Sequence, residues 1–275
     1  MKAALAAIQL ILVGAIAWGG GVSEAAAGST QLAGEVVVYT AASLTEAFTS
    51  IGNLFMKLHP RTEITFNFAG SQKLAQQLAL GAPADVFASA DVKQMQAAQR
   101  SGRIADDGPR IFAHNRLVAV VNIDPTHTVS RLVDLSHSGL KIVLAADTVP
   151  VGSYTREFLA KAARDPAYGT AFRDGVVANT VSLEENVRAV LNKVALGDGD
   201  AGIVYSSDID SVSAAKVREI DIPDALNSIA DYPIAPITDS KNPKSAAAFV
   251  KLVLSPAGQK ILAAYGFIPA VQKAQ

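Results

Sequence analysis

The most constraining feature of this sequence is the alternation of short apolar runs with longer segments of helical periodicity. Val36 to Tyr39 form an apolar run typical of a buried strand. The apolar residues that follow recur every three or four positions, as they do on one face of a helix: Leu44, Phe48, Ile51, Phe55 and Leu58. Such alternation predicts α/β architecture, with parallel sheets covered by helices.

The same order recurs along the chain. Further strands are expected near 64–68, 85–88, 117–121, 141–145 and 201–205, with an extended segment at 231–237. Further helices are expected near 71–81, 92–100, 150–162, 187–194, 243–254 and 256–265. We interpret this as two parallel-sheet-based α/β domains joined by two crossing segments, near 113–121 and 231–237, with a ligand cleft between them. Domain I would comprise 34–113 and 232–275, and domain II would comprise 114–231.

The first residues differ in composition from the rest. Lys2 precedes an apolar run from Ala3 to Val13, glycines follow, and small residues surround Ala25 to Ala27. This pattern predicts a secretory signal peptide over 1–27, cleaved near Ala25 to Ala27. A membrane anchor is the alternative, but the run is short for a span of ~20 residues and breaks into glycines. We therefore expect an exported protein, located in a periplasm.

Composition excludes several function classes. The chain has no cysteine, which excludes disulfides, thiolate metal sites, cysteine nucleophiles and a lipid-modified cysteine. Its net charge of -1, with no long run of either sign, argues against nucleic-acid binding. There is no G-x-S-x-G or G-x-x-x-x-G-K-[ST] motif, and the four histidines lack metal-ligand spacing. We therefore expect neither enzymatic activity nor a cofactor.

The turns from strand to helix are where a ligand site is expected. In open α/β sheets ligands bind beyond the carboxyl ends of strands, and the free N–H groups of helix starts favour anions. Candidate positions there are Ser43, Ser71, the 147–153 loop, the 182–186 segment and Tyr205. The structural alternative is that Ser43, paired with Glu46 in a capping box, and Ser71 only cap helices. Tyr205 could likewise belong to the core.

At these turns the sequence resembles the periplasmic molybdate-binding proteins of molybdate ABC importers. The resemblance runs from about Val36 to Pro269. It rests on the order and spacing of six blocks: AASLTEAF (41–48), FAGSQKLAQQLALGAPADVFASAD (68–91), VPVGSYTREFL (149–159), ENVRAVL (185–191), GIVYSSD (202–208) and LSPAGQKILAAYGF (254–267). It implies the type II periplasmic binding-protein fold and a monomer that delivers molybdate or tungstate to a membrane permease.

The resemblance also implies which groups hold the oxyanion. Matched by motif, they are the hydroxyls of Ser43, Ser71 and Tyr205 and the backbone amides of Val151 and Val187. None is a lysine or arginine, so oriented dipoles would meet the charge, and no protein atom would ligate molybdenum directly. Gly70 and Gln72 stand where some relatives have serines, which reduces the supply of hydroxyls near Ser71.

Other ligands of the same fold stay open as alternatives. A site for protonated phosphate would need a carboxylate acceptor, and none stands among the five positions. A ferric site would need clustered tyrosines or carboxylates, and only Tyr205 is well placed. Sulfate stays open as another oxyanion ligand. From a different functional class, the chain could be an exported enzyme on a two-domain scaffold.

The helix near Val187 has two possible starts. A capping box of Ser182 and Glu185 would begin it at Leu183 and would bond the Val187 amide within the helix. Asn186, also a favoured cap, would begin it at Val187 and leave that amide free. The local sequence slightly favours the first start, whereas oxyanion binding requires the second. We therefore predict that the Val187 N–H has no partner within the helix.

Overall fold

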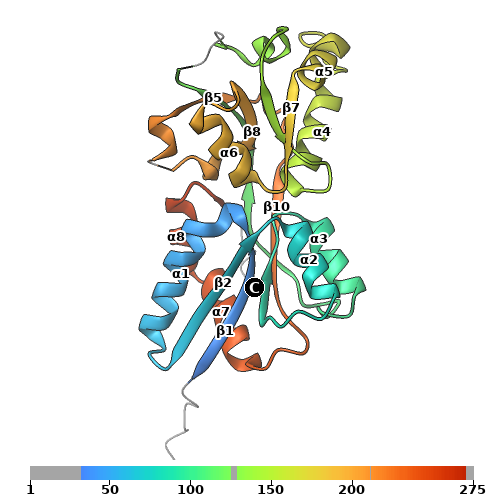
Figure 1. Cartoon of the computed structure of the whole chain (residues 1–275). Coiled ribbons are helices and arrows are strands. Elements are labelled where there is room, and N and C mark those ends of the chain that lie inside the picture. Colours follow the sequence, from blue (N-terminus) through green and yellow to red (C-terminus); the bar gives the residue numbers. More distant parts are fainter. Residues whose placement is uncertain (1–31, 125–128, 211, 271–275) are drawn as a thin grey trace, which may run out of the picture. The chain divides into compact units, whose positions relative to one another are not determined.

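The computed structural model describes residues 32–124, 129–210 and 212–270, and the expected signal peptide lies outside them. The described residues form two mixed β-sheets with helices packed against them. We call the six-stranded sheet, with strand order β11-β4-β10-β3-β1-β2, sheet A, and the five-stranded sheet, with order β7-β6-β8-β5-β9, sheet B. Figure 1 follows the chain through both sheets.

Sheet A is built around parallel pairs between its first strands. β1 (Gly34–Ala41) pairs in parallel with β2 (Thr62–Ala69) and with β3 (Val86–Ala88). β10 (Ala230–Pro236) joins β3 and β4 (Arg110–Asn115) antiparallel, and β11 (Ile268–Pro269) pairs antiparallel with β4. The carboxyl ends of β1 and β2 therefore lie side by side, and the chain turns there into its first two helices.

Helices cover both faces of sheet A. α1 (Thr45–Leu58) contacts α7 (Pro243–Leu254) and α8 (Pro256–Ala264), and these three helices share the core around Phe48, Phe55 and Phe249. A separate core around Leu74 and Phe87 joins the sheet to α2 (Ser71–Ala79) and α3 (Val92–Arg100). Figure 1 shows α1 on one side of β1 and β2, with α2 and α3 on the other.

Sheet B has the same layered construction. β6 (Ile142–Ala145) pairs in parallel with β7 (Thr180–Glu184) and β8 (Ala201–Tyr205). β5 (Leu117–Asn122) runs antiparallel to β8 and β9 (Val217–Asp221). α6 (Val187–Leu196) covers one face, while α4 (Pro150–Ala162) and α5 (Gly169–Ala178) cover the other.

The close packing of α6 on β8 depends on Gly202. A β-carbon at this position would meet Val190 and Val194 of α6 at 2.8 and 3.1 Å, so only glycine lets the helix approach this closely.

Short 3₁₀ turns complete the described elements: η1 (Ala42–Leu44), η2 (Leu132–Ser136), η3 (Ser206–Asp208) and η4 (Ser213–Ala215).

The prediction of two α/β sheets is confirmed, and each sheet also contains antiparallel pairs that the alternation pattern did not indicate. The chain leaves sheet A after Asn115 and enters sheet B at Leu117, within the predicted crossing near 113–121. It returns between β9 and β10, just before the second predicted crossing.

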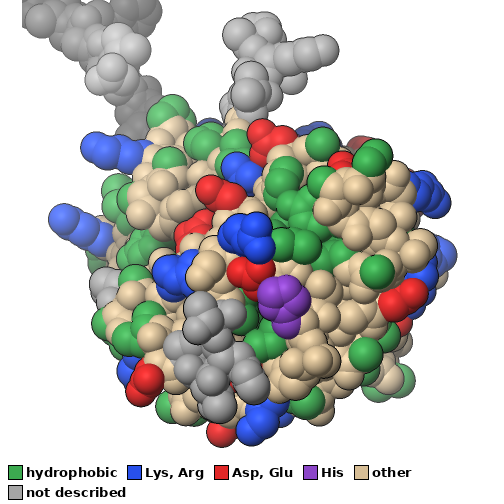
Figure 2. Space-filling model, turned by 90° about the horizontal axis from the view of Figure 1, so that it is seen from above, with side chains coloured by type: hydrophobic (Ala, Val, Ile, Leu, Met, Phe, Trp, Pro, Cys, Tyr) green, Lys and Arg blue, Asp and Glu red, His purple; other side chains and the backbone are tan. Residues whose placement is uncertain are grey.

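Lysine and arginine side chains intermingle with aspartate and glutamate on the face shown in Figure 2, as the near-zero net charge leads one to expect. Among the described residues no single helix is long and apolar enough to cross a bilayer.

Candidate functional site

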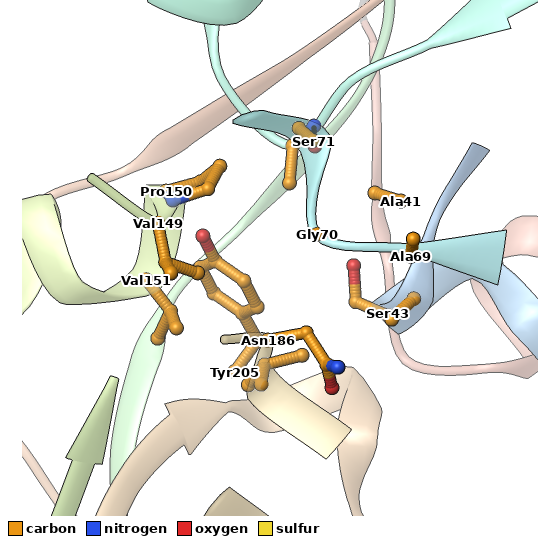
Figure 3. Close-up of a pocket in the computed structure, with 13 residues that line it drawn as sticks. Ala41, Ser43, Ala69, Gly70, Ser71, Val149, Pro150, Val151, Asn186 and Tyr205 are labelled. Carbon is orange, nitrogen blue, oxygen red and sulfur yellow. Dashed lines mark hydrogen bonds between the residues drawn. The ribbon is translucent and has the colours of Figure 1, made fainter. Parts of the chain in front are cut away.

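A small cavity lies where the carboxyl ends of strands from both sheets meet helix starts. Its volume is about 20 Å³, enough for a small ion or a water molecule. The sheet A side contributes residues from the β1, β2 and β3 turns, and the sheet B side contributes residues from the β6, β7 and β8 turns. All five predicted residues line this cavity: Ser43, Ser71, Val151, Val187 and Tyr205. Figure 3 shows the lining residues converging from separate elements.

Ser43 does not cap a helix. It lies in η1, and α1 begins at Thr45 with Leu44 at its cap and no side-chain capping bond, so the predicted capping box with Glu46 is wrong. The 3₁₀ turn shifts the start of the α-helix past the serine and removes Ser43 from capping geometry. Its buried hydroxyl instead lies 3.0 Å from the hydroxyl of Tyr232.

Ser71 is the first residue of α2, and Gly70 occupies the cap position without a side-chain bond. The Ser71 hydroxyl accepts a hydrogen bond from the backbone N–H of Ala90, at 3.0 Å. Because this bond uses the oxygen as acceptor, the hydroxyl proton is left to donate elsewhere. Helix capping alone therefore accounts for neither serine.

Two helix starts on the sheet B side contribute backbone amides. α4 begins at Pro150 and places Val151 at its second position, and α6 begins at Val187. Amides in the first turn of a helix lack partners within it, and no protein acceptor bonds either N–H among the described residues. The prediction for Val187 is therefore confirmed.

Asn186 caps the start of α6, because its side-chain oxygen accepts a hydrogen bond from the Ala189 N–H at 3.0 Å. The competing capping box of Ser182 and Glu185 does not form, since β7 extends through Ser182 to Glu184. Pairing of β7 with β6 holds this segment in extended geometry, so a helix cannot begin at Leu183. Tertiary pairing thus overrides the local capping signal.

Tyr205 ends β8, and its ring is fully buried between Tyr154 and Tyr232, whose ring centroids lie 6.5 and 5.8 Å away. Its hydroxyl has no protein hydrogen-bond partner among the described residues and points into the space between the labelled residues of Figure 3. Burial raises the pKa of the Tyr205 phenol well above its usual range, so the group stays protonated and serves as a donor.

None of the described residues that line the cavity carries a positive charge. Arg188 directly follows Val187, but its guanidinium is engaged by the Glu46 carboxylate and lies 3.3 Å from the Asp208 carboxylate. Burial raises the pKa of Asp208 to about 7, against the opposing influence of Arg188. The cavity therefore offers an anion oriented O–H and N–H groups and helix starts rather than a cation.

Several contacts join the two sides of the site. The Gln72 amide donates to the Glu185 carbonyl at 2.8 Å, and the Gln94 amide donates to the Thr148 carbonyl at 3.3 Å. Glu46 forms an ion pair with Arg188, and Lys73 lies 3.6 Å from the Glu185 carboxylate. These contacts connect helices beside sheet A with the segments that precede or begin α4 and α6. In this structure they keep the donors of both sides together.

Further residues line the cavity or lie beside it, and among these sequence reasoning missed Ala90, Tyr232 and Asn115. Asn186, Pro150 and the small residues Ala42 and Ala90 also line the cavity. Tyr232 and Asn115 lie behind Ser43 and are fully buried. Asn186 and Pro150 lie within the candidate segments 182–186 and 147–153. Tyr232 and Asn115 belong to β10 and β4, strands whose distant pairing brings them to this place. No cluster of three or more metal-ligating side chains occurs in the part of the chain that the structure describes.

Comparison with known proteins places this arrangement in a family. Residues 36–268 match the model of the bacterial extracellular solute-binding proteins. The molybdate-binding protein ModA of Mycobacterium tuberculosis is 41% identical over 241 residues, which cover 88% of this chain and 87% of the relative. The ModA protein of Escherichia coli is 30% identical over 240 residues, covering 85% and 89%.

Solved structures agree on the fold. The substrate-binding domain of a putative molybdenum ABC transporter from Clostridium difficile aligns with a TM-score of 0.64 and 30% identity, covering 86% of this chain and 100% of that one. A periplasmic molybdate-binding protein from Azotobacter vinelandii aligns with a TM-score of 0.72 at 20% identity, covering 86% and 99%, which supports the fold alone. The chain therefore belongs to the bacterial extracellular solute-binding proteins and, within them, to the ModA-type periplasmic binding proteins.

Proposed function

We propose that this protein captures molybdate or tungstate and delivers it to the permease of an ABC importer. Its ligand would be held by the hydroxyls of Ser43, Ser71 and Tyr205 and by the amides of Val151 and Val187, without a cofactor and without direct ligands to the metal. Domain I would comprise 34–113 and 232–275 and domain II 114–231, closing over the anion. The mature monomer would be periplasmic after cleavage near Ala25 to Ala27.

The observation that carries this proposal is the donor set around one cavity. Five groups able to donate converge there, and none of the described lining residues is a lysine, arginine or carboxylate. Hydrogen bonds to a charged group contribute about 1.5–3 kcal/mol each, so several together offset the desolvation of a dianion. Simple addition would overcount, because closure and ordering of the ligand also cost free energy.

The same geometry ranks the alternatives. Hydrogen phosphate would bring a proton for which no lining side chain is a carboxylate acceptor. Ferric ion would need several anionic ligands, and Tyr205 is the one tyrosine among the lining residues. Sulfate shares the charge of molybdate but is smaller, so size decides between them. An enzyme would need a nucleophile with a base beside it, and the hydroxyls of Ser43 and Ser71 contact Tyr232 and a backbone amide instead.

Molybdate and tungstate should raise the melting temperature of the mature protein much more than sulfate or phosphate at equal concentration. A ligand at about 100 times its dissociation constant adds about 2.7 kcal/mol. For a unit of this size that corresponds to a shift of roughly 5–10 °C. Thermal-shift measurements with the four anions test this, and the absence of a shift with both metal oxyanions would remove the assignment.

Tyr205→Phe should weaken molybdate binding by about tenfold without lowering the melting temperature of the ligand-free protein. The substitution removes one charge-assisted hydrogen bond, worth about 1.4 kcal/mol or more. The free energy of unfolding of the ligand-free protein should not fall, because the Tyr205 hydroxyl has no hydrogen-bond partner among the described residues. Calorimetric titration measures the affinity, and Tyr265→Phe, whose hydroxyl contacts Ser50 away from the cavity, is the matched control. An unchanged dissociation constant would exclude Tyr205 from the site.

A further inference from the structure

Behind the cavity, Ser43 is connected to a buried polar network at the point where the chain leaves sheet A. The Tyr232 hydroxyl lies 3.0 Å from the Ser43 hydroxyl. Tyr232 belongs to β10 and Asn115 ends the neighbouring β4. The Asn115 side-chain amide donates to the Tyr232 hydroxyl across a longer contact of 3.5 Å. All three side chains are buried.

The orientation of the Asn115 amide is fixed by its other partners. Its oxygen accepts from the backbone N–H of Arg116 at 3.0 Å, a group that can only donate. The same oxygen accepts from the Ser206 hydroxyl at 3.2 Å. Its nitrogen therefore faces the Ser207 hydroxyl, at 2.7 Å, and Tyr232. This nitrogen has no lone pair to offer, so Tyr232 must be the acceptor in their contact.

The direction of the next hydrogen bond follows by counting protons. The contacts of the Tyr232 hydroxyl are with Asn115 and Ser43. If Ser43 donated to Tyr232, the Tyr232 proton would be buried without an acceptor, an arrangement that is expensive. Tyr232 therefore donates to Ser43. This bond uses one lone pair of the Ser43 oxygen and orients the hydroxyl, so that its own proton is left for the cavity that Ser43 lines.

We propose that Tyr232, oriented by Asn115, is a specificity-determining positioning residue that holds the Ser43 proton toward the bound anion. The inference rests on the proposed function and extends it to a residue that does not line the cavity. The Ala90 N–H orients Ser71 in the same way, because it donates to the Ser71 oxygen and leaves the Ser71 proton to donate elsewhere. With both serines oriented, a fully ionised oxyanion gains two donors, whereas an oxyanion that carries a proton meets a donor where its own proton needs an acceptor.

The variant Tyr232→Phe keeps the ring that packs against Phe112 and Phe267 and removes only the hydroxyl. Ser43 then loses the bond that orients it and can turn its proton away from the cavity. We expect molybdate affinity to fall by about tenfold, close to the full contribution of the Ser43 hydrogen bond to a charged ligand. We also expect the preference for sulfate over hydrogen phosphate, measured by competition against molybdate at pH 8, to shrink by a similar factor.

A double-mutant cycle separates this role from a general structural one. Tyr232→Phe should cost about tenfold in molybdate affinity in the wild-type protein and less than about twofold in a Ser43→Ala background, because it acts through that hydroxyl. Tyr265→Phe should change neither the affinity nor the sulfate preference. Melting curves of the ligand-free variants verify that each is folded.

Three outcomes are decisive. If the wild-type protein does not bind molybdate, the proposed function fails. If it binds, and Tyr232→Phe leaves both affinity and anion preference unchanged, the inference about Tyr232 fails alone. An equal loss in the wild-type and Ser43→Ala backgrounds would likewise overturn it, because Tyr232 would then act on the fold rather than through Ser43. The predicted result is a loss confined to proteins that retain Ser43.

Discussion

Replacing Val187 by proline should lower molybdate affinity by about a hundredfold while leaving α6 helical. The change deletes the backbone N–H that we place among the ligand donors, and the loss of such a bond to an anion is worth about 1.5–3 kcal/mol. The proline ring also adds carbon where that proton stood. Proline is well tolerated at the first position of a helix. The preceding residue, Asn186, already has the extended backbone that a following proline favours, with φ −161° and ψ 166°.

The matched control is Val187→Ala, which shortens the same buried side chain but keeps the N–H. Both variants lose packing in the core, so both should melt at a somewhat lower temperature. Only the proline variant should lose affinity in calorimetric titration, and circular dichroism should report unchanged helix content. Equal affinities of the proline and alanine variants would show that the Val187 amide does not contact the anion.

Asp208→Asn should change the stability of the protein in a strongly pH-dependent way. Burial raises the pKa of Asp208 to about 7, above its ordinary value of 3.8, so the folded protein holds this proton more tightly than the unfolded chain does. Its contribution to stability is therefore fully present below about pH 4 and is lost as the pH rises through about 7. Asparagine cannot ionise, so between pH 5 and 8 the wild-type protein should lose about 2 kcal/mol relative to the variant.

Denaturant unfolding of both proteins at pH 5 and pH 8 measures this difference. Asp210→Asn is an informative control because hydrogen bonds from Ser213 lower the pKa of Asp210. Its stabilising contribution is present above the unfolded value and is lost only in acid, so its effect should be the same at both pH values. If the Asp208→Asn effect is also the same at pH 5 and 8, Arg188 keeps Asp208 ionised throughout this range.

Much of the fold was accessible from hydrophobic periodicity because the strands that are buried on both faces read as apolar runs. β1, β5 and β8 were found in this way, as were α1 and α6 from their spaced apolar residues. β7, β9 and α5 were not anticipated. Apolar residues of α5 and β7, such as Val177, Val181 and Leu183, are exposed, so their apolar character does not mark a buried face there.

The sequence indicated residues that line the cavity but not the local geometry around them. The five residues matched by family motif are all among those that line it, yet the capping rules assigned Ser43 and Ser182 to helix starts that do not exist. Capping signals describe what a short segment prefers in isolation. A 3₁₀ turn after β1 and the pairing of β7 with β6 decide otherwise here. Tyr232 and Asn115 gave no signal at all, because their relation to Ser43 exists only after distant strands have paired.

Two of the five proposed donors are main-chain amides, which has a consequence for mutational scanning. Every residue type except proline supplies the same N–H at positions 151 and 187. A scan that replaces one side chain at a time will register Ser43, Ser71 and Tyr205 and pass over the other two. The set of functional residues found by such a scan will therefore omit two of the five groups proposed to surround the anion. Sequence drift at positions 151 and 187 is compatible with unchanged ligand chemistry.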